Sequence, residues 1–140
     1  MQTFLPYRSF HKTAKCLDYR RLGKQRVEAK QILMILLGET LTKAWKNHPA
    51  VLMWRGYEEA LAYYGVCICE EWIHRGYNDS LLQYFLNRSK ANFLYPKWIG
   101  RRAFHYAHKS NLLRKDAQYY SKYDWNIQNN LPYVWPHASI

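Results

Sequence analysis

Residues 19–37, YRRLGKQRVEAKQILMILL, decide how this sequence folds. Charged residues fill the first half of this stretch, while apolar residues recur at helical spacing and become dense toward Leu37. The pattern predicts a helix over 13–37, which Gly38 would end as a C-cap. Gly23 lies inside it, so we expect either a break or a close approach of another group to the backbone there.

The rest of the sequence also favours helices. Helical runs are predicted over 50–75, ended by Gly76, over 81–86, where Asp79 and Ser80 can cap, and over 96–122. No stretch alternates with period 2 for long, and hairpin dipeptides are absent. We therefore expect an all-α fold, a single compact domain over 1–140 with three or four main helices and an irregular aromatic C-terminal tail.

Composition points to a polyanionic partner. The 140 residues carry 21 Lys and Arg against 10 Asp and Glu, a formal charge of +11, and 17% of them are aromatic. Basic residues concentrate in 1–30 and 101–115, whereas 51–80 is acidic, so we expect the two basic segments to share one face. Positive charge attracts phosphates and aromatic rings stack on bases, a combination that favours nucleic acid.

Other features limit the compartment and the chemistry. Three cysteines are an odd number, so no disulfide framework is expected. The N-terminus has no apolar signal region and no apolar stretch is long enough to span a membrane, which predicts a cytoplasmic, nucleoid-associated protein without membrane contact. Cys67 and Cys69 lack a second pair, and His105 and His108 lack an acidic partner, so we interpret them as buried thiols and surface histidines rather than metal ligands. Gly-rich phosphate loops are also missing, and no cofactor is expected.

One carboxylate stands out in the first basic segment. On a helix Arg21, Lys24, Gln25 and Glu28 share a face, and Glu28 is the only acid between Asp18 and Glu39. It could form an i,i+4 pair with Lys24, worth a few tenths of a kcal/mol. It could instead act as a general acid or base, or stabilise an oxocarbenium ion, on a surface that holds a substrate by its negative charge.

The run LGKQRVE at 22–28 resembles the early Arg- and Glu-bearing helix of the phage-type pyrimidine dimer DNA glycosylases, the endonuclease V family. The end of the second long helix, with Glu71 before Arg75-Gly76-Tyr77-Asn78, is similar to that family's Glu-x-x-x-Arg-Gly-aromatic-Asn. Lys115 matches a late basic residue that precedes an aromatic cluster. HPAVLMW at 48–54, together with LGKQRVE, looks still closer to uncharacterised relatives of that family.

The resemblance implies an all-α enzyme that bends DNA, flips a nucleotide and attacks the sugar C1′ with its N-terminal α-amine, assisted by a Glu. A Schiff base forms, and β-elimination then nicks the strand. In general an α-amine has a lower pKa than a lysine side chain, so more of it is neutral near pH 7. Gln2 is bulky and normally keeps the initiator methionine, which makes the Met1 amine the expected nucleophile and Glu28 its catalytic partner.

The sequence leaves alternatives open at this site. In the family Glu follows Arg directly, whereas here Val27 intervenes between Arg26 and Glu28, and one residue turns a helix position by about 100°. Gln25 and Asp18 are therefore fallback candidates, and a carboxylate that activates water without a Schiff base is another route. The DNA-binding candidates are Arg20, Arg21, Lys24, Gln25, Arg26, His48, Arg101, Arg102, Lys109, Arg114 and Lys115. His48 could instead cap the second helix.

These observations predict a DNA N-glycosylase that excises a damaged or modified pyrimidine, with possible AP-lyase cleavage. The expected partner is double-stranded DNA carrying that base, and the protein is expected to be a monomer. Two alternatives remain: a glycosylase against hypermodified phage bases in defence or counter-defence, and a non-catalytic binder of distorted DNA. A pure binder would gain nothing from Glu28.

Overall fold

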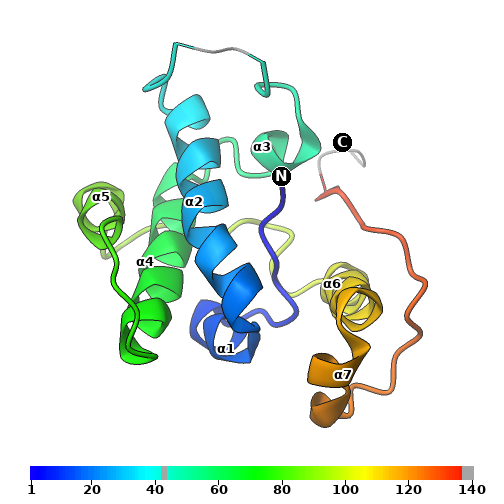
Figure 1. Cartoon of the computed structure of the whole chain (residues 1–140). Coiled ribbons are helices and arrows are strands. Elements are labelled where there is room, and N and C mark those ends of the chain that lie inside the picture. Colours follow the sequence, from blue (N-terminus) through cyan, green and yellow to red (C-terminus); the bar gives the residue numbers. More distant parts are fainter. Residues whose placement is uncertain (42–43, 137–140) are drawn as a thin grey trace.

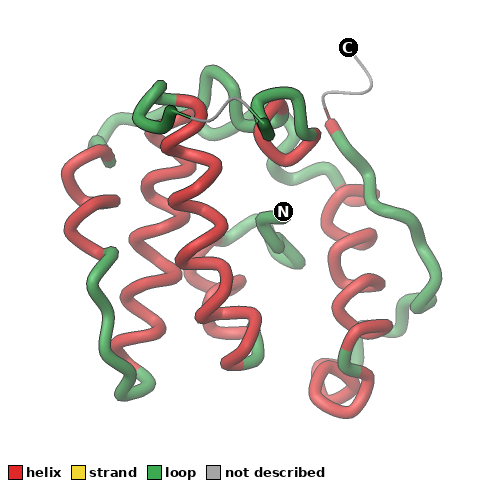
Figure 2. Tube along the Cα trace, turned by 45° about the horizontal axis from the view of Figure 1, so that its top comes forward, coloured by secondary structure: helices red, strands yellow, loops and turns green. Residues whose placement is uncertain are grey.

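The computed structural model describes residues 1–41 and 44–136, and in these two ranges the chain is all-helical without strands (Figures 1 and 2). The all-α prediction is thus confirmed. The elements are α1 (Phe10–Cys16), α2 (Tyr19–Leu36), α3 (Pro49–Leu52), α4 (Glu58–His74), α5 (Leu82–Arg88), α6 (Arg102–Lys115), α7 (Ala117–Tyr120) and a 3₁₀ turn, η1 (Ser121–Tyr123). Within the described ranges no helix is both long and apolar enough to cross a bilayer.

Two predicted helices are each broken into two. The run over 13–37 divides at Leu17, whose extended backbone ends α1, and Asp18 then caps α2 by accepting the Arg21 N–H. The run over 50–75 divides between α3 and α4, where Gly56 has φ +87°, a conformation that favours glycine. The helical region over 96–122 shortens to α6 and α7, because 96–101 forms a turn.

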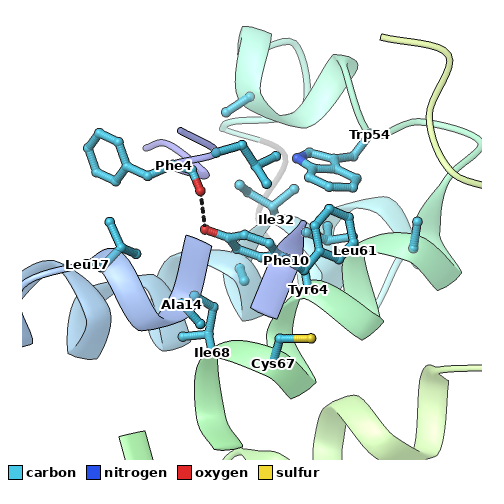
Figure 3. Close-up of a cluster of buried hydrophobic side chains, with 14 of the residues drawn as sticks. Phe4, Phe10, Ala14, Leu17, Ile32, Trp54, Leu61, Tyr64, Cys67 and Ile68 are labelled. Carbon is cyan, nitrogen blue, oxygen red and sulfur yellow. Dashed lines mark hydrogen bonds between the residues drawn. The ribbon is translucent and has the colours of Figure 1, made fainter. Parts of the chain in front are cut away.

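The core is built on the crossing of α2 and α4. Gly23 of α2 faces Trp72 of α4 so closely that a Cβ would lie 2.8 Å from the indole ring. The glycine therefore marks a close approach and not a break. Trp54 and Tyr64 are fully buried beside Phe10, and Figure 3 shows these rings packed together with Ile32, Leu61 and Ile68.

The N-terminal segment, residues 2–5, is threaded through this core. It runs between α2 and α6 (Figures 1 and 2), and its four residues are buried. A segment without regular structure cannot pair its own backbone groups, so side chains must do so. Thr3 accepts a hydrogen bond from Trp54 Nε1 at 3.0 Å, and the Phe4 carbonyl lies 2.8 Å from the Tyr64 hydroxyl (Figure 3).

Two histidines of α6 hold the end of this segment. His108 Nδ1 accepts the Leu5 N–H at 2.9 Å, while His105 Nδ1 lies 2.8 Å from the Leu5 carbonyl oxygen and its Nε2 accepts the Gly100 N–H. Both rings are buried, so the prediction that they lie on the surface is wrong. The three cysteines are free and buried, and among the described residues no group of His, Cys, Asp or Glu could hold a metal ion.

Stability should fall as the pH is lowered from 7 to 5, because these imidazoles are held neutral. Burial lowers the pKa of His108 to about 3, against about 6.5 in an unfolded chain, so protons bind the unfolded state preferentially in this window. We expect His108 alone to lower the unfolding free energy by about 2 kcal/mol when the pH falls from 7 to 5. His108→Gln, whose amide oxygen can accept the Leu5 N–H, should flatten the pH dependence of the unfolding free energy measured with urea.

The matched control is His74→Gln, at an exposed position near the end of α4. It should leave the pH dependence unchanged. An identical slope in wild type and His108→Gln would contradict the assignment of the acid sensitivity to this ring.

Candidate active site

A basic pocket of about 450 Å³ opens where the N-terminal segment meets α2. One wall is the face of α2 that carries Arg20, Arg21 and Lys24, and Lys115 at the end of α6 adds a cation from the second basic segment. The pocket thus joins cations that lie far apart in the sequence. It is lined by Met1, Gln2, Phe4, Arg20, Arg21, Lys24, Gln25, Glu28, His48, Lys115, Tyr133 and Trp135.

An amine and a carboxylate face each other in this pocket. The nitrogen of the Met1 α-amine lies 4.0 Å from Oε1 of Glu28, and the Glu28 side chain is only 13% exposed. Lys24 Nζ also lies 4.0 Å from the same oxygen, but the Lys24 side chain is 74% exposed and reaches toward solvent. Exposed i,i+4 pairs contribute little, so the Lys24–Glu28 pair does not account for a carboxylate that is largely buried here.

Gln25 fixes the position of this pair. Its Nε2 donates to Glu28 Oε2 at 2.8 Å and to the Gln2 carbonyl at 2.9 Å, and its Oε1 accepts the Phe4 N–H at 3.0 Å. The Tyr64 hydroxyl lies 2.7 Å from the same Oε1. One buried amide therefore ties the carboxylate and the N-terminal backbone to the same point of α2.

His48 caps α3 and lies beside the Met1 amine. Its Nδ1 accepts the Ala50 N–H at 3.0 Å, which caps α3 and leaves the ring proton on Nε2. Burial, with a smaller contribution from the nearby positive N-terminal amine, lowers the pKa of His48 and keeps the ring neutral at pH 7. The helix cap considered from the sequence is thus present, and His48 also lines the pocket, while its contact with DNA stays a prediction.

The wall opposite α2 is the tail, residues 124–136, which we call the strap. The strap has almost no regular structure and follows α6 back toward the N-terminus (Figure 1). It is held by α6: Ser110 and Asn111 bind the backbone of Leu131, and Arg114 donates to the Asn129 carbonyl at 2.9 Å. These bonds place Tyr133 and Trp135 on the pocket wall.

Some predicted site residues lie elsewhere. Arg26 turns away from the pocket and pairs with Asp79, with 2.6 Å between Nη2 and Oδ1, so its guanidinium joins α2 to the start of α5. Asp18, a fallback catalytic candidate, caps α2 and pairs with Arg21, and it does not line the pocket. Arg75 binds Glu71 and the Ala14 and Lys15 carbonyls, so it joins the end of α4 to α1.

The remaining basic candidates on α6 are spread along that helix. Arg101 and Arg102 are exposed at its start, and Lys109 lies over the Tyr7 and Trp125 rings, whereas Arg114 holds the strap. Their contact with DNA stays a prediction. A larger hollow of about 640 Å³ lies near the start of α4, but there Arg88 and Lys90 are matched by Glu58 and Glu59, so it lacks the excess of cations found in the basic pocket.

The sequence did not reveal the residues that place the amine. Tyr64, Trp54, His105 and His108 all hold residues 2–5, yet each appears in the sequence as an apolar or isolated polar position on a helix. One signal could have revealed them: Tyr, Trp and His at predicted core positions each carry a polar atom that needs a buried hydrogen-bond partner.

The pocket thus places the N-terminal amine and a carboxylate among several cations, an arrangement that suits a substrate with negatively charged phosphates. Comparison with protein families agrees: the model of the family described as pyrimidine dimer DNA glycosylase matches residues 1–84, more than half of the chain. The chain belongs to this family, which implies DNA glycosylase activity and DNA as its substrate. Comparisons with curated proteins and with solved structures give no match.

Gln25 can be tested as the residue that places the amine and the carboxylate. Gln25→Leu keeps the size of the side chain but leaves the Phe4 N–H and the Gln2 carbonyl buried without these partners, at a cost of about 1–3 kcal/mol each. We expect the unfolding free energy to fall by at least about 2 kcal/mol, measured with urea.

Gln31→Leu is the control, because Gln31 is exposed on the same helix. It should change stability by less than about 0.5 kcal/mol. If Gln25→Leu were as stable as this control and lost only DNA affinity, Gln25 would be a DNA contact, as first predicted, and not a positioning residue.

Proposed function

We propose that this protein is a DNA glycosylase in which the Met1 α-amine attacks C1′ of an altered pyrimidine nucleotide and Glu28 carries the protons. One observation supports this above all others: the amine nitrogen and the Glu28 carboxylate lie 4.0 Å apart in a pocket that also holds cations for the flanking phosphates. The family match supports the glycosylase class, and the mechanism is our inference from the geometry.

The proposed first step forms a bond between the amine nitrogen and C1′. In its neutral form the amine attacks C1′ with the nitrogen lone pair. The N-glycosidic bond breaks, and its electron pair leaves with the base, which takes up a proton from water. The nitrogen, positively charged after the attack, then passes a proton to Glu28. Glu28 then protonates the ring oxygen O4′, the C1′–O4′ bond opens, and a C1′=N Schiff base remains.

Strand cleavage would follow from the same intermediate. Loss of a proton from C2′ and departure of the 3′ phosphate with the C3′–O electron pair is a β-elimination that the Schiff base facilitates. Water then hydrolyses the C=N bond and frees the amine. Arg21, Lys24 and Lys115 would hold phosphates during these steps, because cations in a partly buried site stabilise the developing negative charge.

The nucleophile can be identified by reduction. Borohydride delivers hydride to C1′ of the Schiff base and makes the link permanent, so incubation with a duplex that contains an abasic site should yield a covalent protein–DNA adduct. Peptide mapping should place that adduct on Met1. A two-residue N-terminal extension should abolish trapping at this position, because it converts the Met1 amine into an amide.

The same extension at the C-terminus is the control and should leave trapping intact. An adduct on Lys24 or Lys115 would contradict the assignment of Met1. Base release at the full rate without any adduct would show that water is the nucleophile and that the enzyme is monofunctional.

Glu28→Gln should slow base release by at least about a hundredfold, because removal of a positioned acid–base group costs 10²–10⁴ in rate. DNA affinity should hold or rise, since one negative charge leaves a basic pocket. Single-turnover rates and binding to an abasic duplex would be compared with Glu70→Gln, at an exposed position of α4. Activity of Glu28→Gln within threefold of wild type would contradict a catalytic role for Glu28 and return that role to the fallback candidates, Gln25 and Asp18.

A further inference from the structure

The Met1–Glu28 pair lies at the boundary of two hollows. Besides the basic pocket, a second hollow of about 500 Å³ is lined by Gln31, Met34, Ile35 and Trp45, and both hollows share Met1 and Glu28. We call the second one the apolar pocket. A group held between the amine and the carboxylate would therefore have cations on one side and mainly apolar side chains on the other.

The face of α2 changes its chemistry at Glu28. Toward the start of the helix it carries Arg21 and Lys24, and toward the end it carries Gln31 and Ile35. At 1.5 Å per residue, Lys24 lies about 6 Å before Glu28 along the helix axis and Ile35 about 10 Å after it. Phosphate and base lie on different sides of a nucleotide's sugar, and this face offers a cationic side and an apolar side around one point.

The apolar pocket has the side chains that a nucleobase needs. Trp45 is 52% exposed and makes an edge contact with His48, with 5.7 Å between ring centroids. Gln31 is exposed and its side chain makes no hydrogen bond to the described residues. Met34 and Ile35 are partly buried and form an apolar floor. An amide can both donate to and accept from the edge of a base, while a half-exposed indole offers a face for stacking.

We propose that the apolar pocket receives the nucleobase that is excised, extruded from the duplex as a single unpaired base. This assignment rests on the proposed function, because it takes C1′ to lie between the Met1 amine and Glu28. With the phosphates on the cationic side, the glycosidic bond points to Trp45 and Gln31. The base stacks on Trp45, its hydrogen-bonding edge meets the Gln31 amide, and it leaves into this pocket when the bond breaks.

DNA with an abasic site makes it possible to test the apolar pocket separately from the rest of the mechanism. A duplex with an abasic site presents C1′ and the phosphates without a base, so Schiff-base trapping on it does not require the apolar pocket. Base release from duplexes that carry one modified pyrimidine does require it. A pyrimidine dimer does not suit this comparison, because its excised base stays linked to the neighbouring pyrimidine and is not released. The substrate for the comparison is the duplex of this panel from which wild type releases the base fastest.

Two variants alter the pocket in different ways. Trp45→Ala removes the stacking face and should lower kcat/KM for base release about tenfold or more. Gln31→Trp fills the pocket from an exposed position and should abolish base release. Both variants should form the borohydride-trapped adduct with abasic DNA at a rate within twofold of wild type. A general structural defect would lower this rate as well.

Matched controls come from exposed positions outside both pockets. Tyr95→Ala removes an aromatic ring that is 54% exposed, and Val27→Trp adds an indole at a position of α2 that is 46% exposed. Both should release the base at the wild-type rate.

The outcomes distinguish the two proposals. Wild type that releases no base from any duplex of the panel and forms no adduct on abasic DNA would overturn the proposed function, and the base pocket with it. Wild-type activity that Trp45→Ala and Gln31→Trp leave unchanged, or that they lower equally on abasic DNA, would overturn the base pocket alone. Selective loss on base-bearing DNA supports it.

Discussion

The site depends on the hydrogen bonds that hold residues 2–5 inside the protein. An extended segment in a helical core brings buried N–H and C=O groups that have no partner in their own backbone, and each unpaired group would cost about 1–3 kcal/mol. Side chains from α2, α4 and α6 supply those partners, with Gln25 and His108 at the two ends of the segment. The amine of Met1 is therefore placed by the core itself.

This arrangement links the fold to the chemistry. Gln25 binds both the N-terminal backbone and the Glu28 carboxylate, so the distance between amine and carboxylate is set by a single side chain on a long helix. Groups on rigid elements hold their geometry better than groups on loops, and small displacements of reacting atoms reduce rates steeply. The cations of α2 add attraction for phosphate next to the pair without adding another element.

The sequence predicted the fold class because helical periodicity and the capping residues are local signals. It missed one local signal, the Asp18 cap that begins α2 as a separate helix. It also could not foresee the tertiary contact of Arg26 with Asp79, 53 residues away. Glu28 stood out in the sequence as a lone carboxylate among cations, whereas Met1 was proposed from a resemblance, and the proximity of the two could not be read from spacing. His105 and His108 were misjudged as surface residues because burial of a polar ring depends on the segment that it holds.

The two walls of the basic pocket differ in how they are made. The α2 wall is a helix of 18 residues that packs against α4, whereas the opposite wall is the strap, joined to α6 by a few hydrogen bonds from Ser110, Asn111 and Arg114. Segments with few such bonds open at a smaller free-energy cost than the core. The strap also packs Trp125 against Tyr7 and Tyr133 against His108, yet it is the less firmly held of the two walls. A duplex that needs more room than this pocket offers would therefore displace the strap before it moved Glu28 on α2.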